Sequence, residues 1–184
     1  MDEQKAIFLD RDGVINEVLN ERVKFVNEPE QLFILDGVAT AIKKFNDARY
    51  KVFVVTNQGG IGLGYMTTEQ LERIHEQMKK DLAKEGARID DIAFCPHKPY
   101  EGCPCRKPSP KMLLDLAMKH QIDLKRSYMV GDRAPDIEAG QRAGTKTVHI
   151  GARETNIMLA DHYFSNLRTF SDWLLPENES SKGQ

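Results

Sequence analysis

The sequence lacks an apolar run of the roughly 20 residues needed to cross a bilayer, and residues 1–5 are too polar for a signal peptide. It also lacks a surplus of positive charge, since 26 Lys and Arg face 28 Asp and Glu. The resulting net charge of −2 argues against sequence-independent nucleic-acid binding. We therefore expect a cytoplasmic protein that binds neither membrane nor nucleic acid.

Cysteine is scarce: the chain has three, all between Cys95 and Cys105. An odd number in a reducing compartment argues against a disulfide framework and favours a metal site. Cys95 and His97 form Cys-x-His and, after five further residues, Cys103 and Cys105 form Cys-x-Cys. Three thiolates and one imidazole complete a tetrahedral Zn²⁺ set with no position left for water, which predicts a structural site. Buried cysteines without a ligand are the alternative, but this stretch is too polar for a core.

Hydrophobic residues make up 40% and charged residues 29% of the 184 residues, as in an ordinary globular domain. Apolar strands alternate with helical patterns, which favours a parallel sheet covered on both faces. The predicted strands are 6–9, 52–55, 92–94, 128–130 and 147–150, and the predicted helices are 37–48, 68–85, 111–120, 136–143 and 170–175. We predict an α/β doubly wound domain over residues 1–175, with a zinc loop at 95–108 and a polar tail at 176–184.

Polar clusters follow the predicted strands, at the sheet edge where ligands bind in such folds. Asp10 and Asp12 follow the first strand, and two carboxylates this close are costly unless a cation or a proton offsets their charge. Mg²⁺ would suit them because it prefers oxygen ligands, although a polar turn capped by an aspartate explains the pair equally well. The fourth strand adds Asp132 and Asp136, of which Asp136 could instead cap a helix.

The second predicted strand ends in residues 56–60, Thr-Asn-Gln-Gly-Gly. Their backbone N–H groups could cradle a phosphate, but glycine-rich turns after strands are common. Arg106 and Lys107 directly follow the last cysteine, so a bound zinc ion would hold two cations near the same sheet edge. His75 and His120, in the predicted helices, are expected to be solvated.

In this order, the clusters resemble the four motifs of the haloacid dehalogenase superfamily of phosphotransferases. Asp10-x-Asp12-Gly13 resembles the first motif, Thr56 the second, Lys107 the third and Gly131-Asp132-x-x-x-Asp136 the fourth. With the zinc loop, the chain resembles the D-glycero-D-manno-heptose 1,7-bisphosphate phosphatases and the related histidinol-phosphate phosphatases. The resemblance covers about residues 5–151, without an insertion long enough for a separate cap domain.

The resemblance implies a Mg²⁺-dependent phosphatase with an aspartyl-phosphate intermediate. Asp10 would be the nucleophile and Asp12 the general acid and base. Mg²⁺ would be held by the carboxylates of Asp10 and Asp132 and by the backbone carbonyl of Asp12, while Thr56 and Lys107 would hold the phosphoryl group. The residues expected to bind the substrate are Asn57, Gln58, Gly59, Arg106 and Arg133.

The implied substrate is a small phosphorylated sugar, with the heptose bisphosphate favoured over histidinol phosphate or a broad set of phosphomonoesters. Asp136 is expected to orient Lys107 or the metal's water shell rather than bind the metal. An inactive, zinc-bearing interaction module would need to have lost Asp10, Asp12, Lys107 or Asp132, and all four are present. The near-neutral charge argues against a polynucleotide phosphatase. No apolar stripe suits a coiled-coil dimer, so a monomer is expected.

Overall fold

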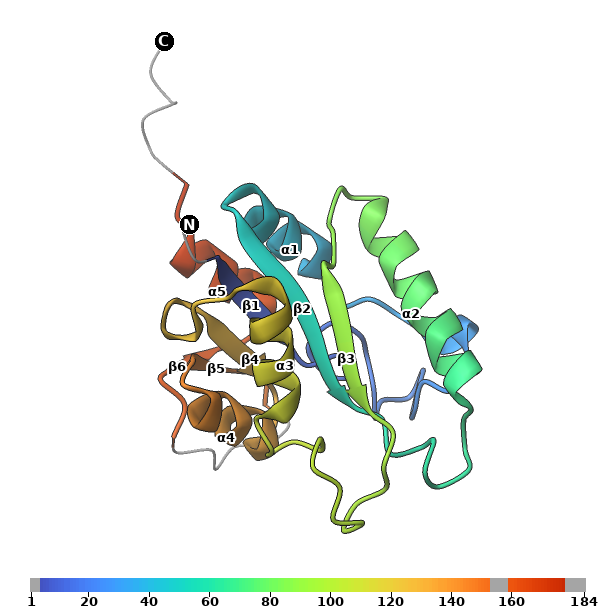
Figure 1. Ribbon diagram of the computed structural model, residues 1–184. Helices are drawn as coiled ribbons and strands as arrows, with labels where there is room; N and C mark the ends of the chain where they lie inside the picture. Colours follow the sequence, from blue (N-terminus) through green and yellow to red (C-terminus); the bar gives the residue numbers. More distant parts are fainter. Residues whose placement is uncertain (1–3, 153–158, 178–184) are drawn as a thin grey trace.

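A six-stranded sheet forms the centre of the computed structural model, which describes residues 4–152 and 159–177 (Figure 1). The strand order is β3-β2-β1-β4-β5-β6, and every pairing is parallel. The strands are β1 Lys5–Leu9, β2 Tyr50–Asn57, β3 Asp91–Cys95, β4 Tyr128–Gly131, β5 Lys146–Ile150 and β6 His162–Phe164. The predicted α/β doubly wound architecture is confirmed.

Helices cover both faces of this sheet (Figure 1). They are α1 Val38–Asp47, α2 Thr68–Ala83, α3 Lys111–His120, α4 Ala134–Ala143 and α5 Leu167–Leu174, with short 3-10 turns η1 Pro29–Gln31 and η2 Leu124–Arg126. Along β1, Ile7 and Leu9 pack in a core shared with α1, α2 and α5. Phe8 points the other way, into a core shared with α3 and α4. This two-sided burial is why the strand is apolar throughout.

Two elements near the carboxyl end differ from the prediction. β6 was missed because its three residues are exposed or half-buried, so they form no apolar run. The last helix begins at Leu167 rather than at residue 170, because Asn166 and Thr169 cap its first turn reciprocally. The predicted tail at 176–184 lies outside the described residues except for 176 and 177.

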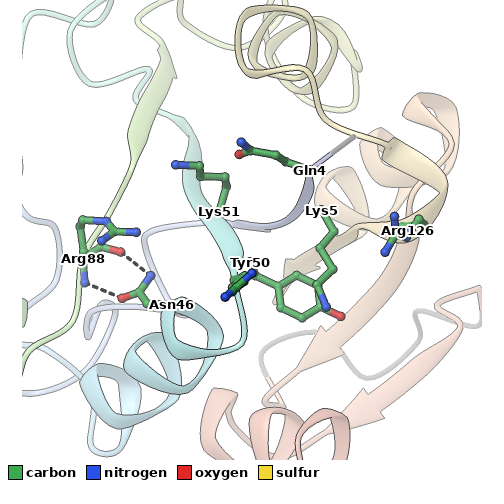
Figure 2. Close-up of a pocket in the computed structure, with 8 residues that line it drawn as sticks. Gln4, Lys5, Asn46, Tyr50, Lys51, Arg88 and Arg126 are labelled. Carbon is green, nitrogen blue, oxygen red and sulfur yellow. Dashed lines mark hydrogen bonds between the residues drawn. The ribbon is translucent and has the colours of Figure 1, made fainter. Parts of the chain in front are cut away.

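Successive strands are added on one side of β1 up to β3 and on its other side from β4 onward, so β1 lies between β2 and β4. Ligands bind at such a switch point, outside the carboxyl ends of the strands. The amino-terminal edge of the same strands borders a separate cavity, shown in Figure 2. Across the parts of the chain that the structure describes, none of the helices is both long and apolar enough to cross a membrane.

Candidate active site

Asp10 directly follows β1, between the carboxyl ends of β2 and β4. Its backbone N–H donates to the carbonyl of Val130 at 3.0 Å, which extends the β1–β4 ladder by one residue. Its side chain is buried and accepts a hydrogen bond from Lys107 Nζ at 2.8 Å. The sheet therefore fixes the backbone of this carboxylate, and a buried cation fixes its side chain.

Lys107 reaches the centre of the site from the loop after the cysteines. Besides Asp10, its Nζ donates to Asp136 Oδ1 and to the carbonyl of Val55, both at 2.7 Å. Burial alone would lower the pKa of Lys107, but Asp10 and Asp136 raise it above its usual value, so the amine stays charged. Asn57 holds the backbone of Lys107 from both sides, donating to its carbonyl at 3.2 Å and accepting from its N–H at 3.0 Å. Asn57 thus positions the lysine.

Asp136 combines the two roles considered for it. Helix α4 begins at Ala134, two residues before the predicted start, so Asp136 lies in its first turn. One carboxylate oxygen accepts from the backbone N–H of Arg133 at 3.1 Å, and the other accepts from Lys107. A Cβ at Gly131 would lie only 2.1 Å from that of Asp136. The glycine therefore allows β4 and α4 to approach closely enough for this arrangement.

Three buried carboxylates meet at this point: Asp10, Asp132 and Asp136 have oxygens within 4.8 Å of one another. Burial, together with the charges of Asp136 and Asp132, raises the pKa of Asp10 to about 8, although Lys107 opposes this shift. Without another cation, Asp10 would therefore hold a proton at neutral pH. A divalent cation offsets such repulsion, and oxygen-only ligands suit Mg²⁺. The donor set therefore fits the predicted metal.

Asp12 is held by a residue that the sequence analysis did not identify. Arg11 is fully buried, and its Nε and Nη2 donate to Asp12 Oδ1 at 3.1 and 2.9 Å. Asn16 donates to the same oxygen at 3.1 Å, and Gln58 donates to the other at 3.2 Å. Burial alone would raise the pKa of Asp12, but the Arg11 charge and these hydrogen bonds lower it. This carboxylate is ionised in the arrangement seen here.

Thr56 ends β2 and is almost completely buried. Its hydroxyl accepts a hydrogen bond from Gln58 Nε2 at 2.9 Å, and the same amide nitrogen donates to Asp12. Gln58 itself is only 6% exposed. It therefore links the second motif to the first through its hydrogen bonds to Thr56 and Asp12.

The prediction that His75 is solvated was wrong. This residue of α2 is only 6% exposed, and its Nε2 lies 3.2 Å from Arg11 Nη1. Burial and the nearby Arg11 charge lower the pKa of His75 to about 3, so the neutral ring faces the guanidinium. His120 is not freely solvated either, since its Nε2 lies 2.7 Å from Asp91 Oδ2 and its side chain is 23% exposed.

Acid should therefore weaken the fold through His75. In the unfolded chain this histidine gains a proton below about pH 6.5, whereas the folded chain accepts it only near pH 3. The folded-state pKa is depressed, so stability falls as the pH drops through this window, by about 1.4 kcal/mol per pH unit. Urea unfolding of wild type and of His75→Gln between pH 7 and pH 4.5 measures this. The stability of the variant should fall less steeply, whereas parallel pH profiles would contradict the assignment; His162→Gln is the control.

A cavity of about 650 Å³ opens beside Asp10. Of the predicted substrate-binding residues, Asn57, Arg106 and Arg133 line it, and the stretch from Pro99 to Cys103 forms one wall. Gln58 and Gly59 line a neighbouring cavity of about 510 Å³, which Arg106 also borders. Arg106 is held by its hydrogen bond to the carbonyl of His97 at 3.2 Å. The loop that carries the cysteines therefore also places a cation at the mouth of the site.

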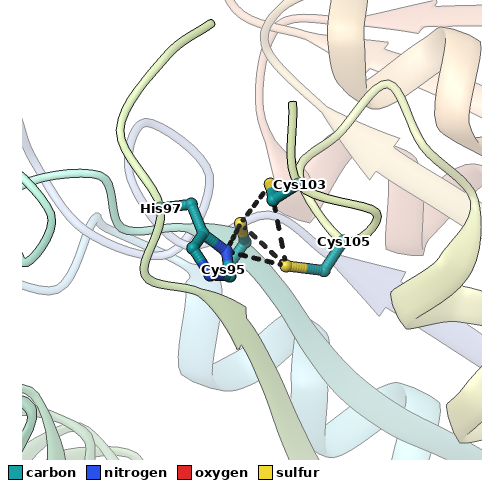
Figure 3. A group of neighbouring side chains, drawn as sticks. All are labelled: Cys95, His97, Cys103 and Cys105. Carbon is teal, nitrogen blue, oxygen red and sulfur yellow. Dashed lines mark hydrogen bonds between the residues drawn. The ribbon is translucent and has the colours of Figure 1, made fainter. Parts of the chain in front are cut away.

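The four predicted zinc ligands converge (Figure 3). The three Sγ–Sγ distances are 3.0, 3.6 and 3.9 Å, too long for disulfides. Tetrahedral Zn–S bonds of about 2.3 Å place sulfurs about 3.8 Å apart, which two of the three pairs approach. His97 Nδ1 lies 3.4 and 3.3 Å from the sulfurs of Cys95 and Cys105. Burial and hydrogen bonding raise the pKa of Cys95 to about 12, so forming its thiolate requires a cation. The set fits a closed metal site.

Comparisons with known proteins agree with this geometry. A family model for HAD-hydrolase-like proteins matches residues 104–161. A D-glycero-beta-D-manno-heptose-1,7-bisphosphate 7-phosphatase of Rhodopseudomonas palustris is 44% identical, covering 76% of this chain and 79% of the relative. A phosphatase of Photorhabdus laumondii named for the alpha anomer is 37% identical, covering 88% and 93%.

Among solved structures, the D,D-heptose 1,7-bisphosphate phosphatase of B. bronchiseptica, complexed with magnesium and phosphate, superimposes with a TM-score of 0.86 at 33% identity. The match covers 95% of this chain and all of that one. Fold, sheet-edge carboxylates and sequence identity over most of the chain lead to the same assignment. The chain belongs to the haloacid dehalogenase-like hydrolases, in the family of the D-glycero-D-manno-heptose-1,7-bisphosphate 7-phosphatases.

Proposed function

We propose that the chain hydrolyses D-glycero-D-manno-heptose 1,7-bisphosphate at the 7-phosphate, with Asp10 as the nucleophile. The observation that carries this proposal is the buried Asp10 carboxylate at the switch point of the sheet, hydrogen-bonded to Lys107 at 2.8 Å and open to a cavity of about 650 Å³. The names of the relatives supply the substrate class. A sugar bisphosphate also suits the two guanidinium groups, Arg106 and Arg133, that line the cavity.

Asp10 would attack phosphorus in line while the sugar oxygen leaves, which gives an aspartyl phosphate; water then attacks phosphorus and regenerates the carboxylate. Asp10, Asp132 and the backbone carbonyl of Asp12 would hold Mg²⁺, which keeps the carboxylates ionised and offsets the phosphoryl charge. Lys107 and the hydroxyl of Thr56 would bind the phosphoryl oxygens. These groups are arranged before the substrate arrives, because each is buried and hydrogen-bonded.

Asp12 would move the protons in both steps. It would donate to the leaving sugar oxygen in the first and accept from the attacking water in the second. Arg11 lowers the pKa of Asp12, which favours accepting. The negative charge of a bound phosphate beside Asp12 opposes the effect of Arg11 and favours the protonated acid needed first.

The deciding experiment is phosphate release in Mg²⁺ buffer from both anomers of the heptose bisphosphate, histidinol phosphate and several hexose phosphates. We expect kcat/KM to be highest for one heptose anomer. Preference for histidinol phosphate would keep the catalytic assignments and replace the substrate. Equal rates on all substrates would indicate a broad phosphomonoesterase, and no release from any would contradict an active enzyme.

We also propose that Cys95, His97, Cys103 and Cys105 bind one structural Zn²⁺. The four ligand atoms fill a tetrahedral set, and the cluster lies in the loop that forms one wall of the substrate cavity. The ion would fix this wall and, through the carbonyl of His97, the position of Arg106. It takes no part in the reaction, because no coordination position is left for water or substrate.

Removing one ligand tests the zinc proposal. Cys105→Ser should lower the zinc content, measured by elemental mass spectrometry, from one equivalent per chain to a small fraction. Changing a residue that only contacts a metal ligand lowers metal affinity by about 10- to 100-fold, and losing a ligand itself lowers it further. KM should rise more than kcat falls, because the cavity wall loosens while Asp10 and Lys107 stay in place. Ser109→Ala, in the same loop, should keep its zinc. Full zinc content in Cys105→Ser would refute the assignment.

A further inference from the structure

A second cavity, of about 590 Å³, lies at the amino-terminal edge of the sheet, where β1 and β2 begin (Figure 2). Its lining includes five cations: Lys5, Arg49, Lys51, Arg88 and Arg126. None of its lining residues in the described chain is acidic. The whole protein carries a net charge of −2, so this concentration of positive charge is local and does not reflect the average surface.

Few carboxylates offset these cations. Asp90 accepts from Lys51 Nζ at 3.4 Å and from Arg88 Nε at 3.3 Å, so a single carboxylate is shared by two of the cations. Lys5 Nζ lies 4.0 Å from the centre of the Tyr50 ring. Over the residues that the structure describes, the remaining guanidinium groups, of Arg49 and Arg126, form no ion pair within 4 Å. The cavity therefore has unused capacity for an anion.

Arg49 shows an independent sign of a role in binding. Its backbone is left-handed, with φ of 62°, just after the end of α1. Glycine adopts this conformation freely, whereas a side chain there is strained. Strain of this kind at an exposed position is a reason to look for a function of the side chain. The chain thus places a guanidinium at a cavity wall where glycine would be the more stable residue.

The size and chemistry of the cavity indicate the ligand. A volume near 590 Å³ is in the range for small-molecule sites, and guanidinium groups bind phosphate oxygens in a forked, two-point geometry. Five cations gathered in one hollow suit a compact anion with several charges better than a long polymer, which would need a stripe of positive charge. Asn46, whose amide is hydrogen-bonded to the backbone of Arg88 at 3.1 and 2.8 Å, fixes one wall (Figure 2).

We propose that this cavity binds a small molecule that carries a diphosphate group, at a site separate from the catalytic one. β1 spans five residues between the two edges of the sheet, and at about 3.3 Å per residue the two sites lie roughly 17 Å apart. A ligand at this edge touches the first residues of β1 and β2, the strands whose other ends carry Asp10 and Thr56. The proposal is independent of which sugar phosphate the catalytic site hydrolyses.

The test is a calorimetric titration of the zinc-loaded protein, without added Mg²⁺, using ADP and inorganic pyrophosphate as probes. Wild type should bind either probe at one site, and Arg49→Gly/Arg126→Ser should bind about tenfold or more weakly. Its phosphatase activity should stay at the wild-type level. Lys79→Ser/Lys111→Ser, which removes the same charge from exposed helix positions, should bind like wild type. Arg49→Gly alone should raise the melting temperature by about 1–3 °C while weakening binding.

Several results would overturn the proposal. One is that wild type binds neither probe. Another is that the two double variants bind the probes equally well, which would place the anion at Lys107 or at no defined site. Tighter binding of a single-stranded oligonucleotide than of ADP, lost in Arg49→Gly/Arg126→Ser, would replace the small molecule with a nucleic acid. Because phosphate release is measured separately, an inactive enzyme that still binds ADP would contradict only the proposed function.

Discussion

Phosphate release by Asp10→Asn should fall by at least about 10⁴-fold, because an amide cannot serve as the nucleophile. The same change should not weaken the fold. Burial and the charges of Asp136 and Asp132 raise the pKa of Asp10 to about 8, so at neutral pH the structure already disfavours its ionised form. A neutral amide removes this repulsion. We therefore expect a melting temperature equal to or above that of wild type when both are measured without Mg²⁺.

The control is Asp36→Asn, which removes a carboxylate from an exposed position just before α1 and should leave the rate within about twofold. Trapping the intermediate with a radiolabelled phosphate substrate adds a second readout. Label should become covalently attached to wild type and not to Asp10→Asn. Residual activity above about 1% of wild type in Asp10→Asn would mean that another group attacks phosphorus.

Lys107→Met should impair both activity and stability. The lysine is hydrogen-bonded to Asp10 and Asp136 and its side chain is only 2% exposed, so its loss leaves two buried carboxylates facing each other. Breaking a buried ion pair from one side costs about 3–5 kcal/mol, and losing a charged donor to the phosphoryl group costs on the order of 10³-fold in kcat. Urea unfolding and steady-state phosphate release measure the two effects.

The pH dependence gives a sharper check of this variant. Without Lys107 the pKa of Asp10 should rise above about 8, further above its unfolded value. A carboxyl group whose folded pKa is raised loses stability as pH rises toward that pKa. Metal-free Lys107→Met should therefore lose stability relative to wild type as pH rises from 8 to 9.5, because wild-type Asp10 ionises in this range whereas Asp10 of the variant still holds its proton. Lys111→Met, at an exposed helix position, should follow the wild-type profile, and a flat difference for Lys107→Met would contradict the ion-pair network.

Much of the fold could be predicted because β1, β2, β4 and β5 are buried on both faces and so form clear apolar runs. The same logic failed for β6, whose three residues alternate without an apolar run. The start of α5 was missed although Asn166 and Thr169 carry a capping pattern. A sequence pattern of only three or four residues does not determine a strand or a helix start by itself, because the tertiary contacts of the folded chain decide whether the element forms.

For the candidate site, the sequence predicted which residues gather at the edge of the sheet but not which side chains they contact there. Asp10, Thr56 and Asp132 follow from motifs at strand ends and Lys107 from the loop after the cysteines, and the structure brings them to one edge of the sheet. Nothing in the sequence marks Arg11 as a buried partner of Asp12, since an arginine between two aspartates is usually solvated. His75, 64 positions from Arg11, became buried through the packing of α2. Asn57 and Gln58, expected at the substrate, line the two cavities, and their amides also hold Lys107 and Asp12, which the sequence did not indicate.

The place of β1 between β2 and β4 has a consequence for how the enzyme emerges from the ribosome. β1 can pair with β2 once residue 57 is made, but its partnership with β4 must wait until residues 128–131 have been synthesised. Until then one edge of the strand that leads to Asp10 is open, and open edges favour pairing with other chains. Nascent chains stalled before residue 128 should therefore be the aggregation-prone species, and slow translation of that region should lower the yield of folded protein.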